Sequence, residues 1–216
     1  MIRDINIDEI SDGNRYTSRD MVRVGCNDCA GCSKCCRDMG KSIILDPYDV
    51  FNICTALGKS FDELIDTDEA VIELSIVDGL LLPNLRMNIV GNCCNLLSED
   101  GRCTIHDSRP GFCRLFPLGR IYEDGGFSYF NQIYECDYPN KSKVKIKNWL
   151  GIDNLSQYER FVLKWHDYMD TLRRELSDLE DTNAVSRFWV IILKKFYREP
   201  YDTNRPFFEQ IEERMG

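Results

Sequence analysis

The chain has 216 residues, of which 43% are hydrophobic, and it can therefore bury one substantial core or two modest ones. Its 36 acidic residues outnumber its 27 lysines and arginines, which gives a formal net charge of −9. That balance argues against a general nucleic-acid binder, because such proteins gain affinity by neutralising phosphates with basic side chains.

The chain divides into three predicted segments. Residues 1–25 form a polar lead-in with one short strand at Ile5 and Ile7, residues 26–140 form a cysteine-cluster metal-binding domain, and residues 141–216 form a helical extension packed on that domain. The fold class that we expect is α+β: an irregular cysteine-rich metal-binding module with short strands, plus C-terminal α-helices.

Turn and capping signals define the first elements after the cysteine-rich loop. Residues 42–45 are expected to form a short strand. Asp46 and Pro47 then supply the N-cap and the first position of a helix, and Gly58 is placed to end it. A capping box over residues 60–63 opens a second, shorter helix.

Two stretches in the middle of the chain are expected to be extended. Residues 71–90 are rich in isoleucine, leucine and valine, and they are interrupted at residues 78–79 (Asp-Gly) and 83–84 (Pro-Asn). Residues 119–133 predict a β-hairpin, because β-forming residues flank a strong turn signal at residues 123–126.

The composition changes after residue 140, where cysteine disappears. Four alternating lysines indicate a solvated connector: Lys141, Lys143, Lys145 and Lys147. Apolar residues at three- and four-residue steps from Tyr158 to Leu176 then predict a long amphipathic helix. A second helix carries apolar residues from Val185 to Phe196 and ends near Glu199 and Pro200, and a short terminal helix follows Pro206. We expect their aromatic stripes to pack onto the cysteine module.

The expected compartment decides how the cysteines are interpreted. The first ten residues carry acids and no apolar signal-peptide core, and no apolar run approaches the ~20 residues of a membrane helix. We therefore expect a cytoplasmic protein with neither a membrane nor a nucleic acid as partner. In that reducing compartment, cysteine clusters are more often metal or redox sites than disulfides.

The densest cysteine group predicts a metal site. Five cysteines occur within eleven residues in the pattern C-x2-C-x2-C-x2-C-C: Cys26, Cys29, Cys32, Cys35 and Cys36. A thiolate at every third position lets one short loop wrap a metal. The pattern C-x2-C-x2-C begins the [4Fe-4S] loop of bacterial ferredoxins, and C-x2-C is also half of a structural zinc site.

A second group of cysteines can complete the coordination: Cys93, Cys94, Cys103, Cys113 and Cys136. Gly101 allows the chain to turn tightly just before Cys103. Pro110 can open a short helix that carries Cys113. Cys54 is interpreted differently, as a packing residue, because it lies on the apolar face of its predicted helix.

Basic side chains are interspersed with the thiols: Lys34, Arg37, Arg102, Arg109 and Arg114. Such cations favour the thiolate form and offset the charge of an anionic cluster. The alternative is that Arg109 and Arg114 brace the loop by donating to backbone carbonyls or to Asp107. His106 is expected to make a hydrogen bond beside the metal rather than to bind it.

The two cysteine motifs resemble those of the YkgJ-type cysteine-cluster family of zinc- or iron-chelating domains, which includes flagellin lysine N-methylases. The resemblance covers about residues 26–140 and comprises C-x2-C-x2-C-C and C-x8-C-x-I-H-x2-R-P-x2-C-R-x-F-P. Cys26 and Cys93 are additional to the family pattern. The resemblance implies eight metal ligands: Cys29, Cys32, Cys35, Cys36, Cys94, Cys103, Cys113 and Cys136.

The identity of the metal stays open between two interpretations. Three thiolates at a strict x2 spacing favour an iron–sulfur cluster, [4Fe-4S], over zinc. Adjacent Cys35 and Cys36 cannot easily face the same ion unless a polynuclear centre lies between them. Zinc, as a structural site or in a metal chaperone, explains the same thiols without redox chemistry.

The function expected on these grounds is that of a cysteine-ligated metalloprotein with a structural or redox role. The family resemblance also implies an alternative, a metal-dependent enzyme that modifies protein lysines with S-adenosylmethionine as methyl donor. No nucleotide-binding loop and no catalytic residue can be identified. The partners expected are a metal ion or cluster and a protein substrate or redox partner.

Overall fold

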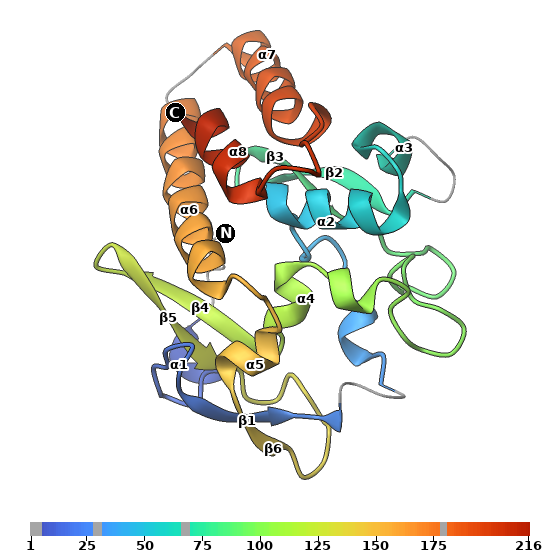
Figure 1. Ribbon diagram of the computed structural model, residues 1–216, viewed down its shortest axis with the longest axis vertical. Helices are drawn as coiled ribbons and strands as arrows, with labels where there is room; N and C mark the ends of the chain where they lie inside the picture. The colour runs from blue at the N-terminus through green and yellow to red at the C-terminus, as the bar shows by residue number, and fades with distance from the viewer. Residues whose placement is uncertain (1–5, 28–31, 66–69, 178–180) are drawn as a thin grey trace.

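The computed structural model describes residues 6–27, 32–65, 70–177 and 181–216 (Figure 1). Helices and short antiparallel strand pairs make an α+β fold, as the sequence predicts. The elements in chain order are α1 (Ile7–Ile10), β1 (Met21–Gly25), η2 (Lys34–Cys36), α2 (Pro47–Leu57), α3 (Phe61–Ile65), β2 (Ile72–Val77), β3 (Leu80–Leu85), η3 (His106–Ser108), α4 (Gly111–Leu115), β4 (Leu118–Glu123), β5 (Gly126–Asn131), β6 (Ser142–Lys145), α5 (Ile146–Leu150), α6 (Leu155–Ser177), α7 (Thr182–Leu193), η4 (Lys194–Arg198) and α8 (Phe207–Met215).

The described strands pair as three two-stranded antiparallel sheets, β1–β6, β2–β3 and β4–β5. The hairpin predicted at residues 119–133 is confirmed as β4–β5, and the extended segments predicted within residues 71–90 pair as a second hairpin, β2–β3. Both turn on an Asp-Gly pair in the left-handed conformation, with φ of 51° and 77° at residues 78–79 and of 52° and 71° at residues 124–125. Turns of this hand match the twist of the flanking strands. The predicted break at residues 83–84 is wrong, because both residues lie inside β3.

Capping chemistry fixes α2 and α3 as predicted. Asp46 and Asp49 form a reciprocal capping box at the start of α2, and Gly58 ends the helix at a φ of 63°. Ser60 and Glu63 make the equivalent contacts at the start of α3. The predicted strand at residues 42–45 is reduced to an isolated bridge between Ile44 and Asn84 of β3.

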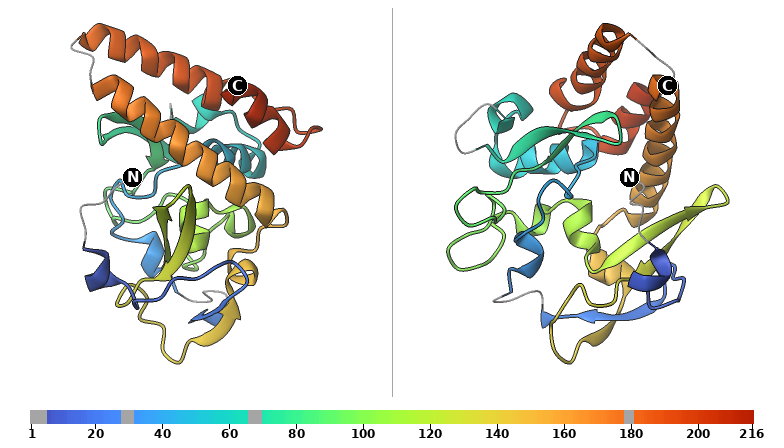
Figure 2. Two further views of the ribbon diagram at one scale, coloured as in Figure 1. Left: turned by 90° about the vertical axis from the view of Figure 1, so that its left-hand side faces the viewer. Right: turned by 180° about the vertical axis from the view of Figure 1, so that it is seen from behind.

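The C-terminal helices form the larger hydrophobic core with α2, α3 and the β2–β3 hairpin. The apolar stripe predicted for α6 is buried in full, from Tyr158 to Leu176. The helix α7 runs directly into the π-helical turn η4, and α8 follows Pro206. The views in Figure 2 place α6, α7 and α8 at the same end of the molecule as α2 and α3, with β1, β6 and α5 at the other end.

The segment expected to be a solvated connector is ordered instead. Residues 142–145 form β6, which pairs with β1, and α5 follows at once. The side chains of Ile146 and Leu150 are fully buried beside Val22 and Val24 of β1, in a smaller core that α4, β4 and β5 complete. Lys143 and Lys145 are therefore exposed residues of β6, and Lys147 is an exposed residue of α5.

The N-terminal segment has a helix where the sequence predicts a strand. The strand expected at Ile5 and Ile7 is wrong at Ile7, which begins α1 after Asn6 has capped it, and Ile5 lies outside the described residues. No helix in the described ranges is both long and apolar enough to cross a bilayer. The division of the chain into a lead-in, a metal-binding domain and a helical extension stays a prediction.

Candidate metal centre

The cysteine-rich segments enclose a cavity of about 260 Å³. Eight of the described cysteines line it: Cys26, Cys32, Cys35, Cys36, Cys94, Cys103, Cys113 and Cys136. Seven of them belong to the eight ligands implied by the family resemblance, and the eighth predicted ligand, Cys29, lies outside the described residues. Cys26 was not among the predicted ligands, although its x2 distance to Cys29 continues the cysteine period and could have indicated it.

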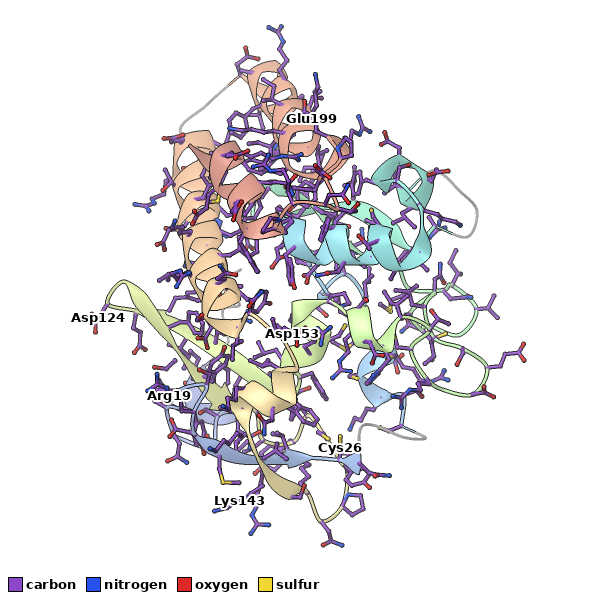
Figure 3. The ribbon with its side chains drawn as sticks, in the orientation of Figure 1. Arg19, Cys26, Asp124, Lys143, Asp153 and Glu199 are labelled. Carbon is purple, nitrogen blue, oxygen red and sulfur yellow. The ribbon has the colours of Figure 1, made fainter. Side chains whose placement is uncertain are left out.

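One wall of the cavity is the single turn η2. Its backbone places Cys35 and Cys36 on the same cavity although they are neighbours in sequence. A hydrogen bond between the two thiols, together with burial, raises the pKa of Cys35. Cys26 reaches the cavity from the end of β1, where Figure 3 labels it.

A second wall is the segment that follows β3. The backbone N–H of Cys94 donates to the carbonyl of Cys36 at 2.8 Å, and Cys93 forms a bridge with Arg37. This pairing turns Cys94 into the cavity, and Cys93 is absent from its lining. Burial raises the pKa of the Cys94 thiol to about 11, although the N–H of Leu96, 3.5 Å from its sulfur, opposes the shift.

The third wall carries Cys103 and Cys113. Gly101, at a φ of 76°, makes the predicted turn ahead of Cys103, and the predicted short helix α4 presents Cys113. Burial raises the pKa of both thiols, most strongly that of Cys113. A metal that binds these thiols as thiolates must therefore displace their protons, so metal binding is coupled to pH.

Contacts from outside the cavity hold α4 in place. The N–H of Gly111 donates to Oδ1 of Asp49 at 2.7 Å, which ties the start of α4 to α2. On the opposite side of the cavity, Lys34 of η2 forms a hydrogen-bonded ion pair with Asp137, the residue after Cys136. The ion pair links η2, which carries Cys35 and Cys36, to the segment of Cys136, about a hundred positions away in the chain.

The basic residues near the thiols have two different roles. Lys34, Arg102 and Arg109 line the cavity, and so does His106. Arg114 instead braces the backbone, donating to the carbonyls of residues 107, 109, 150 and 151. The bracing interpretation is therefore confirmed for Arg114.

His106 lies between the thiols and the basic residues. Nη1 of Arg109 is 2.9 Å from Nδ1 of His106 and donates to the carbonyl of the same residue at 3.2 Å. The imidazole thus contacts the guanidinium of Arg109. This arrangement fits a supporting hydrogen-bond role beside the metal.

The thiols surround a space rather than a point. Among the described residues, no three His, Cys, Asp or Glu side chains lie close enough together to hold a single metal ion. Seven of the cysteines that line the cavity are in no disulfide: Cys32, Cys35, Cys36, Cys94, Cys103, Cys113 and Cys136. Soft sulfur donors with nearby cations suit zinc or iron centres, and the donor set therefore fits a metal group bound by thiolates.

Cys54 and Cys93 provide matched controls, because neither lines the cavity. Cys54 packs against the larger hydrophobic core. We expect Cys54→Ala and Cys93→Ala to retain the wild-type metal content, measured as metal per chain by elemental mass spectrometry. A loss of metal from either variant would show that the cavity lining does not define the ligands.

Comparison with protein families gives an independent result. Residues 28–136, about half of the chain, match the family model CxxCxxCC, described as "Putative zinc- or iron-chelating domain". No curated protein and no solved structure matches the chain. The matched span begins just after Cys26 and ends at Cys136, so it contains the other cysteines that line the cavity. The chain therefore belongs to the CxxCxxCC family of zinc- or iron-chelating domains.

Proposed function

We propose that the protein holds an iron–sulfur centre, [4Fe-4S], in the thiol-lined cavity and serves a structural or redox role through it. The observation that carries this proposal is the gathering of thiols from distant segments around one cavity. The proposed ligands are drawn from Cys29, Cys32, Cys35, Cys36, Cys94, Cys103, Cys113 and Cys136, with Cys26 as a further candidate.

The adjacent pair Cys35 and Cys36 supports a polynuclear centre over one zinc ion. Four sulfurs bound to zinc each lie ~2.3 Å from the metal and must therefore be close to one another. Thiolates that bind a cluster of several irons are spread around a larger body. Adjacent Cys35 and Cys36, which both line the cavity, can reach different irons of such a body.

Charge and polarity of the lining support the same proposal. Thiolates and sulfides make a cluster anionic, and Lys34, Arg102 and Arg109 line the cavity as compensating cations. Apolar side chains complete the wall: Ile43, Leu85, Leu96 and Phe116. An apolar shell limits access of water and so tunes the reduction potential of the one-electron chemistry that an iron–sulfur cluster supplies.

The reducing cytoplasm is the compartment in which we place this centre. Thiols that are to bind a metal must stay reduced until it arrives. The described cavity thiols Cys32, Cys94 and Cys113 are in no disulfide, which supports this placement.

Anaerobic purification tests the proposal. We expect brown protein that absorbs near ~400 nm and contains about four irons and four sulfides per chain. Elemental mass spectrometry and a sulfide assay on the same sample measure the stoichiometry. Colourless protein with stoichiometric zinc and no sulfide would overturn the iron–sulfur centre and leave a structural zinc protein.

A further inference from the structure

Six basic residues gather on the sheet formed by β1 and β6 and on its flanks. We call this set the basic ribbon: Arg19, Arg23, Lys141, Lys143, Lys145 and Lys147. All of them are exposed except Lys141, which is half-buried. Figure 3 labels Arg19 and Lys143 at the end of the molecule remote from the C-terminal helices. Such a concentration of positive charge is local, because the chain as a whole has a net charge of −9.

The register of the sheet places the cations on one face. Arg23 lies opposite Lys143, and Met21 lies opposite Lys145. The alternate residues Val22 and Val24 point into the smaller core, so the paired cations point to solvent. Like charges directly opposite each other on a sheet destabilise it. The outer face therefore carries repulsion that a bound anion would relieve.

No acid in the part of the chain that the structure describes forms an ion pair with these cations. Two acids close in sequence are already engaged. The carboxylate of Asp20 accepts from the N–H and the hydroxyl of Thr17 at 2.7 Å and 2.8 Å, and Asp137 pairs with Lys34.

A pocket of about 240 Å³ lies beside the metal centre, on the face of β6 opposite to Lys143 and Lys145. Ser142 and Val144 of β6 form one side of the pocket. Cys26, Arg109 and Trp149 line both this pocket and the thiol-lined cavity. A group that occupied the pocket would therefore contact the wall of the metal centre.

We propose that the basic ribbon docks an acidic segment of a protein partner on the outer face of the β1–β6 sheet. Charge complementarity supports this occupant, because it speeds encounter and selects the partner without requiring a large interface. A long nucleic acid is disfavoured, since it would extend from the small ribbon onto a surface of net negative charge. The proposal names the partner for the function proposed above, and its test does not depend on which metal is bound.

A pair of charge reversals tests the docking surface. The probe is a fluorescein-labelled peptide of about ten glutamates, and a glutamine peptide of equal length is the uncharged comparison. Binding to the metal-loaded full chain is measured by fluorescence anisotropy. We expect Lys143→Glu/Lys145→Glu to weaken binding roughly ten-fold or more and to flatten its salt dependence. The neutral pair Lys143→Gln/Lys145→Gln should give a smaller loss.

The matched control is Lys59→Glu/Arg187→Glu. These two residues are exposed, form no ion pair in the described part of the chain, and lie on the far elements, after α2 and on α7. The control makes the same change in net charge and should bind the peptide as the wild type does, apart from a small loss shared by all such variants. The proposal would be overturned if both charge reversals weakened peptide binding equally, or if the wild-type protein did not bind the acidic peptide.

Two further readouts keep the result separate from the function proposed above. Metal content and the absorption spectrum should be unchanged in all the variants, so a loss of peptide binding at full metal content supports the docking surface. Tighter binding of a short DNA duplex than of the peptide, abolished by the same reversal, would assign the ribbon to nucleic acid and overturn the proposal.

Discussion

Replacing Cys113 with serine is expected to strip the metal from the protein and to unfold residues 26–140. The thiol of Cys113 lies on α4 against the cavity, and burial raises its pKa strongly. A serine hydroxyl there cannot replace a thiolate ligand of zinc or iron. Because the binding site forms only in the folded chain, metal-binding energy is also folding energy, and loss of one ligand is expected to cost several kcal/mol, on the order of 5.

Elemental mass spectrometry and thermal unfolding followed by circular dichroism measure the two effects. Cys32→Ser is the second ligand variant and should behave in the same way, whereas Cys54→Ala, whose thiol packs in the larger core, should not. A Cys113→Ser protein with wild-type metal content and an unchanged Tm would remove Cys113 from the proposed ligands. In that case the cavity would hold its metal through other thiols.

The second large effect is expected at Gly111, the first residue of α4. A Cβ atom at this position would lie 2.0 Å from Oη of Tyr158 and 3.2 Å from its Cζ. Tyr158 is almost fully buried and accepts from Nη2 of Arg120 at 3.3 Å, so its ring cannot move aside freely. Gly111→Ala should therefore destabilise the protein by ~1–3 kcal/mol, the usual cost of overpacking a core.

Tyr158→Phe provides the compensating change. Without the hydroxyl, only the ring contact of 3.2 Å opposes the new methyl group of Gly111→Ala. We expect the double variant to be more stable than the sum of the single effects, measured by urea unfolding as a double-mutant cycle. Strictly additive costs would show that the contact with Tyr158 does not cause the destabilisation. Metal content should fall with Gly111→Ala, because α4 also carries Cys113.

Local signals in the sequence identify most of the elements because the physics that forms them is local. Asp46 and Gly58 bound α2 through contacts with their own neighbours. The Asp-Gly pairs specify hairpin turns by their tolerance of positive φ. Pro83 is the exception, since a local rule excludes proline from strands. Beyond its pairing with β2, β3 pairs only through an isolated bridge at Asn84, so a missing N–H there costs little and the strand accommodates Pro83.

Long-range pairing explains what the sequence could not predict. Residues 142–145 become a strand because β1 lies beside them, and Arg23 and Lys141, which share a hydrogen bond, are 118 positions apart. Long-range pairing also decides which of the adjacent cysteines, Cys93 or Cys94, lines the cavity. The choice follows from the backbone bond between Cys94 and Cys36, which no spacing in the sequence reveals. The ligand set itself stays a prediction, derived from cysteine spacing and family resemblance.

The pairing of β1 with β6 has a consequence for how the protein captures its metal. The two strands flank the span of the family match and join its ends at Gly25 and Ser142. Closing a loop of about 115 residues costs roughly 4 kcal/mol of chain entropy. The β1–β6 sheet holds these ends together, so the metal does not have to supply the whole of that cost when it binds. A fragment trimmed to the matched span would lack this closure, and it would release its metal to a competing chelator more readily than the full chain.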